Sequence, residues 1–212
     1  MRVFIIESAS PLDLLNGTSE SAALENICKM MGHKVVSFFA KSEREFGEIC
    51  NYISSIDSVE RVKRDEPICI HLSSHGDKNG ILFGRDDLSW DKITQYLKPI
   101  FKMDYKEDFF LIISACGTDN HKLHHSMRKS IIESKITPPR YIFSINEDEV
   151  EWRDSALIWT ILYHQIENLN SDKRSDFQGL LRRIQAADLG YLKYHRWDNK
   201  QKKYLPFSKK KA

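Results

Sequence analysis

The sequence predicts a three-layer α/β/α domain, in which helices cover both faces of a mainly parallel central sheet. Three observations lead to this fold class. Short runs of branched and aromatic apolar residues are typical of strands buried on both faces, as in parallel sheets. Segments of ten or more residues with helical periodicity alternate with these runs, which favours right-handed crossovers. No internal repeat or low-complexity linker interrupts the alternation.

The first half of the chain contains three predicted strands, each followed by a predicted helix. An apolar strand over residues 2–7 precedes a helix over residues 19–31. Thr18 or Ser19 can cap the free amides at the start of this helix, and Gly32 is a typical helix stop. The other elements of this half are a strand over 35–40, a helix over 42–55, a strand that begins at residue 68 and ends before His75, and a helix over 89–101.

The second half continues the alternation and ends in two helices. Pro138 and Pro139 separate a helix from the strand that follows them. Residues 154–168 are dense in apolar side chains, which predicts a helix that covers the sheet. The elements in order are a strand over 109–114, a helix over 119–135, a strand over 140–145, and helices over 154–168 and 177–187.

Length and composition fit one globular domain over residues 1–195 with a basic tail over residues 196–212. The chain has 212 residues, 41% hydrophobic and 29% charged, with a net charge of +2. This charge gives no general attraction to nucleic acid or to membranes, and we expect neither as a partner. The lysine-rich tail is more typical of a solvated terminus than of a binding patch.

The cysteines and the N-terminus predict a cytoplasmic protein. Four cysteines at scattered spacings form no disulfide framework. The apolar stretch from Met1 to Glu7 is too short for a secretory signal, and no segment approaches the roughly 20 apolar residues that span a bilayer. A reducing compartment also preserves a reactive thiol.

Two buried strands of the prediction end at chemically capable side chains, His75-Gly76 and Cys116-Gly117. Ligands bind outside the carboxyl ends of strands in open α/β sheets, so these side chains can converge there. A neighbouring imidazole activates a thiol, and the backbone amides of Gly76 and Cys116 can bind an oxyanion. The alternative is that cysteine packs as a small apolar residue, which is our interpretation of Cys28, Cys50 and Cys69.

The order of these landmarks resembles that of the caspase-like cysteine peptidases, and most closely their bacterial CHAT-domain branch. The matching segments are the strand with His75-Gly76, Gly80-Ile81-Leu82-Phe83-Gly84, Leu88-Ser89-Trp90, and the strand with Ser114-Ala115-Cys116-Gly117. They cover roughly residues 66–165, and more loosely the first sixty. The resemblance implies a peptidase without a cofactor, with Cys116 as nucleophile, His75 as general base and acid, and the Gly76 and Cys116 amides as oxyanion hole.

An acidic loop precedes the helix predicted over residues 154–168. In the caspase-like family, the corresponding region helps to build the pocket for the residue before the cleaved bond. This chain has no arginine pattern that would imply the aspartate preference of animal caspases. A substrate-binding set of carboxylates would favour lysine or arginine there. The members of this set are Asp77, Glu147, Asp148, Glu149 and Asp154, with Asp119 as a possible addition. The alternative is a plain acidic surface loop.

The resemblance also implies partners. Bacterial domains of this type often cut neighbouring gene products, including in antiviral defence and programmed cell death, so we expect a protein substrate of that kind and an activating partner or self-cleavage. Two alternatives stay open: a catalytically silent flavodoxin-like binding or signalling module, and a hydrolase of small amides. The chain has neither a Gly-x-Gly-x-x-Gly nor a Gly-Lys-Ser/Thr phosphate motif, which argues against a nucleotide site.

Other histidines have weaker functional interpretations. His71 lies in the strand before His75 and is expected to be a hydrogen-bonded packing residue. His121, His124 and His125 could form a metal site with Cys116, but only His121 with one of the other two would share a helix face. A solvated helix face is the default, so no metal is predicted, and no calcium-loop spacing is present.

Overall fold

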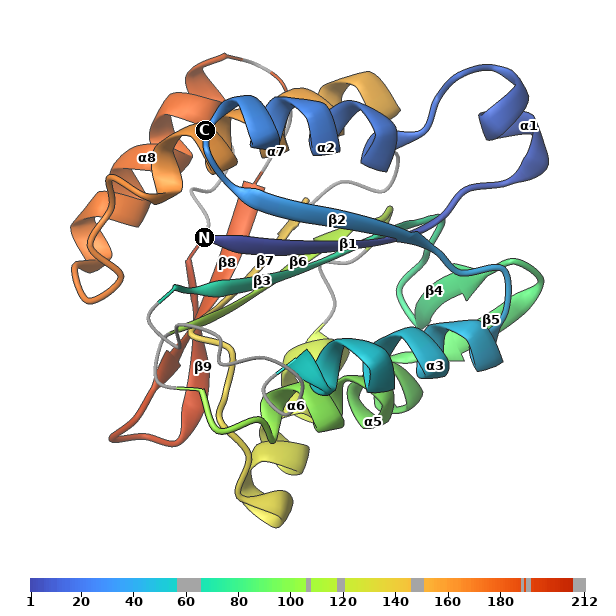
Figure 1. The fold of residues 1–212 in the computed structure, drawn as a ribbon. Helices are drawn as coiled ribbons and strands as arrows, with labels where there is room; N and C mark the ends of the chain where they lie inside the picture. Colours follow the sequence, from blue (N-terminus) through green and yellow to red (C-terminus); the bar gives the residue numbers. More distant parts are fainter. Residues whose placement is uncertain are drawn as a thin grey trace.

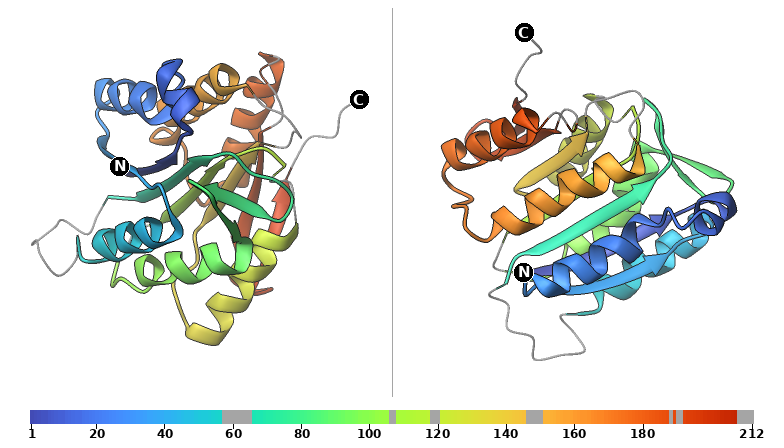
Figure 2. Two further views of the ribbon diagram at one scale, coloured as in Figure 1. Left: turned by 90° about the vertical axis from the view of Figure 1, so that its right-hand side faces the viewer. Right: turned by 90° about the horizontal axis from the view of Figure 1, so that it is seen from above.

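A seven-stranded sheet runs through the centre of the computed structural model, with helices on both faces (Figures 1 and 2). The structure describes residues 1–56, 66–105, 108–117, 121–145, 151–187, 189 and 192–207. The strand order is β2-β1-β3-β6-β7-β8-β9. The five strands from β2 to β7 in this order pair in parallel, and β8 and β9 pair antiparallel. The predicted three-layer α/β/α fold with a mainly parallel sheet is therefore confirmed.

The strands of the sheet are β1 (Arg2–Ser8), β2 (Lys34–Phe39), β3 (Ile68–Ser74), β6 (Phe109–Ser114), β7 (Tyr141–Ile145), β8 (Leu192–Asp198) and β9 (Lys203–Phe207). A separate two-stranded hairpin comprises β4 (Gly80–Phe83) and β5 (Asp86–Ser89). The helices are α1 (Pro11–Leu15), α2 (Glu20–Met30), α3 (Glu43–Ser54), α5 (Trp90–Phe101), α6 (His121–Ser134), α7 (Trp152–Ile166) and α8 (Arg174–Ala186).

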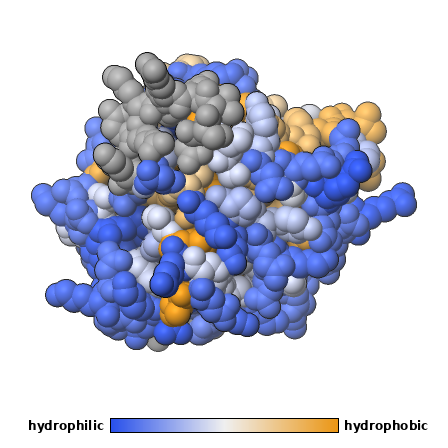
Figure 3. Space-filling model, turned by 60° about the horizontal axis from the view of Figure 1, so that its bottom comes forward, coloured by the Kyte–Doolittle hydropathy of each residue, from blue (hydrophilic) through white to orange (hydrophobic). Residues whose placement is uncertain are grey.

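Two apolar cores lie on opposite sides of the sheet. Helices α2, α7 and α8 cover one face, and α3, α5 and α6 cover the other (Figure 1). Side chains of one strand alternate between the two cores: Val3 and Ile5 pack on the α2 and α7 side, whereas Phe4 and Ile6 pack on the α3 and α5 side. The outer surface of the α3, α5 and α6 layer is mostly hydrophilic, with scattered hydrophobic residues (Figure 3). Burial on both faces explains why the central strands are continuous apolar runs.

Several helices begin where the sequence predicts. The hydroxyls of Ser19, Ser42 and Ser89 each accept a hydrogen bond from the backbone three residues on. They satisfy amides that the first helical turn leaves free. Gly32 has a φ of +86°, the left-handed conformation that commonly follows a helix end. None of the helices in the described ranges is long and apolar enough to cross a membrane.

The C-terminal part differs from the prediction. The predicted domain boundary at residue 195 falls inside β8, and β9 lies wholly within the predicted tail. Charged and polar residues in both strands obscure the apolar pattern, although Lys193 and His195 are buried in the sheet. Residues 208–212 lie outside the described part of the chain. The helix α1 and the strands β4 and β5 are also absent from the predicted elements.

Candidate active site

The loops that carry His75 and Cys116 meet at the carboxyl ends of two neighbouring strands. β3 and β6 pair in parallel, with Ser73 opposite Ser114, so both strands end at the same edge of the sheet. Gly117 has a φ of +64°, and a Cβ on it would lie 3.1 Å from the Asp77 Cα. Glycine therefore allows the backbone after Cys116 to lie directly against the backbone after His75.

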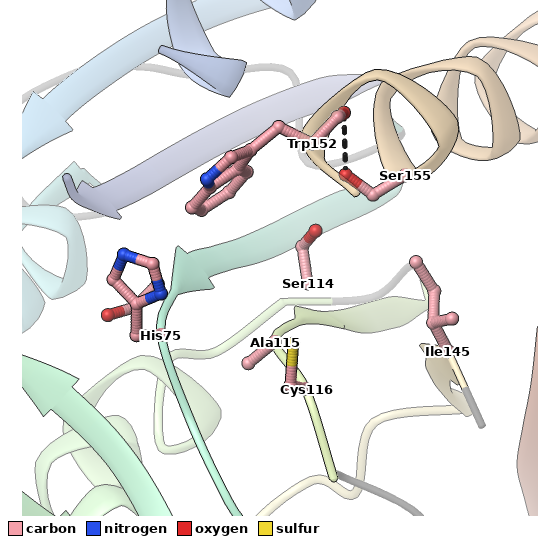
Figure 4. A pocket seen from close by; sticks show the side chains of 8 residues that line it. His75, Ser114, Ala115, Cys116, Ile145, Trp152 and Ser155 are labelled. Carbon is pink, nitrogen blue, oxygen red and sulfur yellow. Dashed lines mark hydrogen bonds between the residues drawn. The ribbon is translucent and has the colours of Figure 1, made fainter. Parts of the chain in front are cut away.

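A small pocket of about 50 Å³ opens between these loops and the start of α7 (Figure 4). Its lining residues are Ser74, His75, Ser114, Ala115, Cys116, Ile145, Trp152 and Ser155. The predicted pair, His75 and Cys116, thus lines a single cavity, as expected from the positions of both residues after adjacent strands.

Cys116 differs from the other three cysteines in its burial. It is half-buried, whereas Cys28, Cys50 and Cys69 are buried. Burial raises the pKa of Cys28 and Cys69 to about 12, and it raises the pKa of Cys50 as well. These three thiols are therefore unreactive packing residues at neutral pH.

His75 is held by a carboxylate that lies far away in the sequence. Its Nε2 is 3.0 Å from Oδ2 of Asp13, and its ring makes a T-shaped contact with Trp152 at a centroid distance of 5.6 Å. The pKa of Asp13 is lowered: partial burial acts to raise it, but hydrogen bonds from Ser10 and His75 outweigh that effect. An ionised Asp13 can only accept, so Nε2 of His75 donates, and Nδ1 keeps its lone pair for proton exchange.

The short helix α1 presents Asp13 to His75. Ser10 Oγ accepts a hydrogen bond from the Asp13 backbone amide at 3.2 Å, and Asp13 Oδ2 accepts one from the Ser10 amide at 2.9 Å. This reciprocal capping box, with Pro11 in the first turn, fixes the carboxylate directly after β1. The sequence interpretation missed Asp13. The signal that could have revealed it is Ser10-Pro11-Leu12-Asp13 directly after an apolar strand.

The backbone at Gly76 suits the predicted oxyanion hole. Asp77 donates its amide to Gly80 O at 3.0 Å, and Leu82 donates its amide to His75 O at 2.9 Å. These two bonds flank the pair Gly76–Ile81, so the Gly76 N–H is directed away from β4. A Cβ at Gly76 would lie 3.0 Å from that of Ala115, so a side chain there would crowd the loop before Cys116. The oxyanion role of the Gly76 and Cys116 amides stays a prediction.

The predicted acidic substrate-binding set is not assembled by the described residues. Asp77 accepts hydrogen bonds from the amides of Asn79 and Gly80 and so shapes the turn before β4. Asp154 lies in the first turn of α7, 3.6 Å from Arg153 Nε. Neither residue lines the pocket. Glu147, Asp148, Glu149 and Asp119 lie outside the described residues.

Two buried carboxylates lie behind the pocket, and the sequence interpretation missed both. Glu20 Oε1 accepts hydrogen bonds from Ser114 Oγ at 2.9 Å and from Ser155 Oγ at 2.7 Å. Glu7, also fully buried, accepts from the amides of Glu20 and Ser21 at the start of α2. Burial acts to raise the pKa of Glu20, but the interaction with His71 and the Ser155 hydrogen bond lower it overall.

His71 is a packing residue, which confirms its interpretation from the sequence. Its ring is completely buried. Nε2 lies 3.3 Å from Glu20 Oε2, and Nδ1 hydrogen-bonds to the Tyr163 hydroxyl at 2.9 Å. Both ring nitrogens therefore have protein partners inside the core.

The histidines of α6 lie on the opposite side of the sheet from α2 and α7. The His124 ring stacks on His195 of β8 at a centroid distance of 4.3 Å and lies 4.8 Å from that of His125. The His121 side chain lies outside the described part of the structure. Among the side chains that are described, no three His, Cys, Asp or Glu residues form a group that could hold a metal ion.

No protein-family model matches the chain, and no curated protein matches it in sequence.

Proposed function

We propose that this chain is a cysteine endopeptidase of the caspase-like type that cleaves a partner protein through Cys116 and His75. The observation that carries the proposal is the pocket that both residues line: Cys116 is half-buried there, and the Nε2 of His75 is held by Asp13. Nucleophile, base and orienting group are the three parts that thiol-based acyl transfer requires.

The proposed reaction proceeds in two halves. His75 Nδ1 accepts the Cys116 thiol proton, and the thiolate attacks the carbonyl carbon of the peptide bond. The Gly76 and Cys116 amides stabilise the oxyanion, and the His75 imidazolium then donates its proton to the leaving amine as the C–N bond breaks. Water, deprotonated by His75, hydrolyses the thioester and regenerates the thiol. Asp13 stabilises the imidazolium that forms in each half.

The biological setting extends the same proposal. The order of motifs from His75 to Gly117 resembles that of CHAT domains, which supports a protein substrate encoded near this gene and an activating partner. We propose a cytoplasmic location, because the buried thiols form no disulfide framework and a reducing compartment preserves Cys116. The likeness to CHAT domains supports a role within a bacterial defence or cell-death system.

A peptide library that varies the residue before the cleaved bond tests the proposal. Cys116→Ala should abolish hydrolysis, because alanine cannot form the thioester. Cys28→Ala is the matched control: it removes a buried thiol on α2, outside the pocket, and should retain cleavage. Equal hydrolysis by the parent and the Cys116→Ala variant would contradict the proposal. Inactivity of the parent, also with neighbouring gene products added, would favour a binding module.

Thiol alkylation gives an independent test. Iodoacetamide at neutral pH should modify the folded protein at one position, Cys116, because burial protects the other three thiols. Peptide mapping by mass spectrometry identifies the labelled residue. Labelling of Cys28 or Cys69 at a similar rate in the folded protein would contradict the assignment of Cys116 as the accessible nucleophile.

A further inference from the structure

Two serine hydroxyls form one side of the pocket, and their hydrogen bonds determine how they face a ligand. Ser114 and Ser155 lie on the side of the pocket away from His75 (Figure 4). Each hydroxyl donates to the same oxygen, Oε1 of Glu20. Ser114 Oγ also accepts a hydrogen bond from Trp159 Nε1 at 2.8 Å. Because a hydroxyl has one proton, donation to the buried carboxylate leaves oxygen lone pairs as the groups available to the pocket.

A further acceptor lies on the Ser155 side of the pocket. Ser155 Oγ lies 2.9 Å from the backbone carbonyl oxygen of Trp152, within hydrogen-bonding distance. The hydroxyl proton therefore has two acceptors, Glu20 and this carbonyl, and the charged one is the stronger. This part of the pocket is thus rich in acceptors and suits a ligand that brings N–H donors.

The charge behind the serines is negative. Glu20 and Glu7 are both buried, and among the described residues neither forms an ion pair with lysine or arginine. Among the described residues, His71 is the basic side chain beside Glu20, with its Nε2 3.3 Å from Glu20 Oε2. In the weakly screened interior, the negative charge of Glu20 attracts a cation in the pocket and repels a carboxylate.

The pocket of about 50 Å³ is too small for a whole lysine or arginine side chain, but its walls suit the charged end and the adjoining part of the stem. Trp152 and Ile145 line it beside the serines. Lysine and arginine bury their methylene stems against apolar surface, and an indole ring face also attracts their charged groups.

We propose that Glu20 is a specificity-determining residue that acts through Ser114 and Ser155 to select lysine or arginine before the cleaved bond. This inference rests on the proposed peptidase function. It assigns the charge preference to the start of α2, beneath the pocket, rather than to the acidic loop before α7.

Peptides that differ only in charge provide the test. The parent enzyme, Glu20→Gln and Glu25→Gln are compared on peptides with arginine or its neutral isostere citrulline before the cleaved bond. Glu25→Gln is the matched control, because Glu25 lies on the same helix, pairs with Lys29 and does not line the pocket. We expect the parent and the control to favour arginine over citrulline by about tenfold or more in kcat/KM, and Glu20→Gln to lose most of this preference.

The ratio separates specificity from stability. A variant that only folds less well loses activity on both peptides together and keeps the parental ratio. Ser155→Ala serves as a second variant if Glu20→Gln does not fold, because it removes one hydroxyl between Glu20 and the pocket and leaves the carboxylate in place. It should lower the arginine preference several-fold.

Two outcomes would overturn the inference in different ways. Cys116-dependent cleavage with equal use of arginine and citrulline, or an unchanged ratio in Glu20→Gln and Ser155→Ala, would refute the role of Glu20 alone. Absence of Cys116-dependent cleavage of every peptide would refute the proposed function and this inference with it.

Discussion

His71 and His75 lie four residues apart, and each has a carboxylate and a tryptophan as neighbours. Each has Nε2 beside a carboxylate, Glu20 at 3.3 Å for His71 and Asp13 at 3.0 Å for His75. Each ring also makes a T-shaped contact with a tryptophan of α7, with centroid distances of 5.5 and 5.6 Å. The difference is exposure: the His71 side chain is 0% exposed and that of His75 is 48% exposed.

This comparison shows that partners alone do not define a catalytic histidine. His71 has both nitrogens engaged in the core and no path to a substrate, so its carboxylate pair contributes to the fold. His75 has one engaged nitrogen, and it lines the pocket with Cys116. A histidine can exchange protons with a substrate only where one nitrogen stays accessible.

The largest expected effect is on activity and comes from the exposed histidine. His75→Ala should lower kcat/KM by about 10³-fold or more, because the thiol loses its base and the leaving group its acid. The free energy of unfolding should change by less than about 1 kcal/mol, because the side chain is half exposed. Peptidase assays and urea unfolding measure the two quantities. Retained activity would assign the base to another residue.

The buried histidine should show the opposite pattern. His71→Ala should lower the free energy of unfolding by about 3 kcal/mol, because it leaves Glu20 and the Tyr163 hydroxyl with one partner fewer and opens a cavity in the core. Urea denaturation followed by circular dichroism provides the measurement. A loss below about 1 kcal/mol would mean that the pair contributes little to the fold.

Removing the charge of Asp13 tests the orienting interaction of His75. Asp13→Asn should lower kcat by about tenfold with little change in KM, because an amide no longer stabilises the imidazolium or selects the Nε2–H tautomer. The side-chain oxygen can still cap α1, so stability should change little. Unchanged kcat would limit Asp13 to capping.

The smallest effect concerns stability in acid. The pKa of Glu20 lies below its usual value of 4.5, so the unfolded chain takes up this proton at a higher pH than the folded protein does. The stabilisation by ionised Glu20 is complete above about pH 4.5 and is lost as the pH falls through the lower, folded-state pKa. The difference in unfolding free energy between the parent and Glu20→Gln should therefore shrink from pH 6 to pH 3. A constant difference would contradict the lowered pKa.

Local signals in the sequence predicted much of the fold. Apolar runs located the central strands, and Ser19, Ser42 and Ser89 marked helix starts within one residue. β8 and β9 escaped prediction because their charged and polar residues break the apolar pattern. The length of the tail was overestimated for the same reason.

The sequence alone determined the placement of His75 and Cys116, because each directly follows an apolar strand and parallel strands end at a common edge. Which carboxylates lie beside them depends on the tertiary structure. Asp13 lies 62 residues from His75, and Glu20 lies 94 residues from Ser114 and 135 from Ser155. No periodicity links such positions. The pairing of β1 with β3 and the packing of α2 against α7 bring them together, and that long-range packing separates a buried histidine from a reactive one.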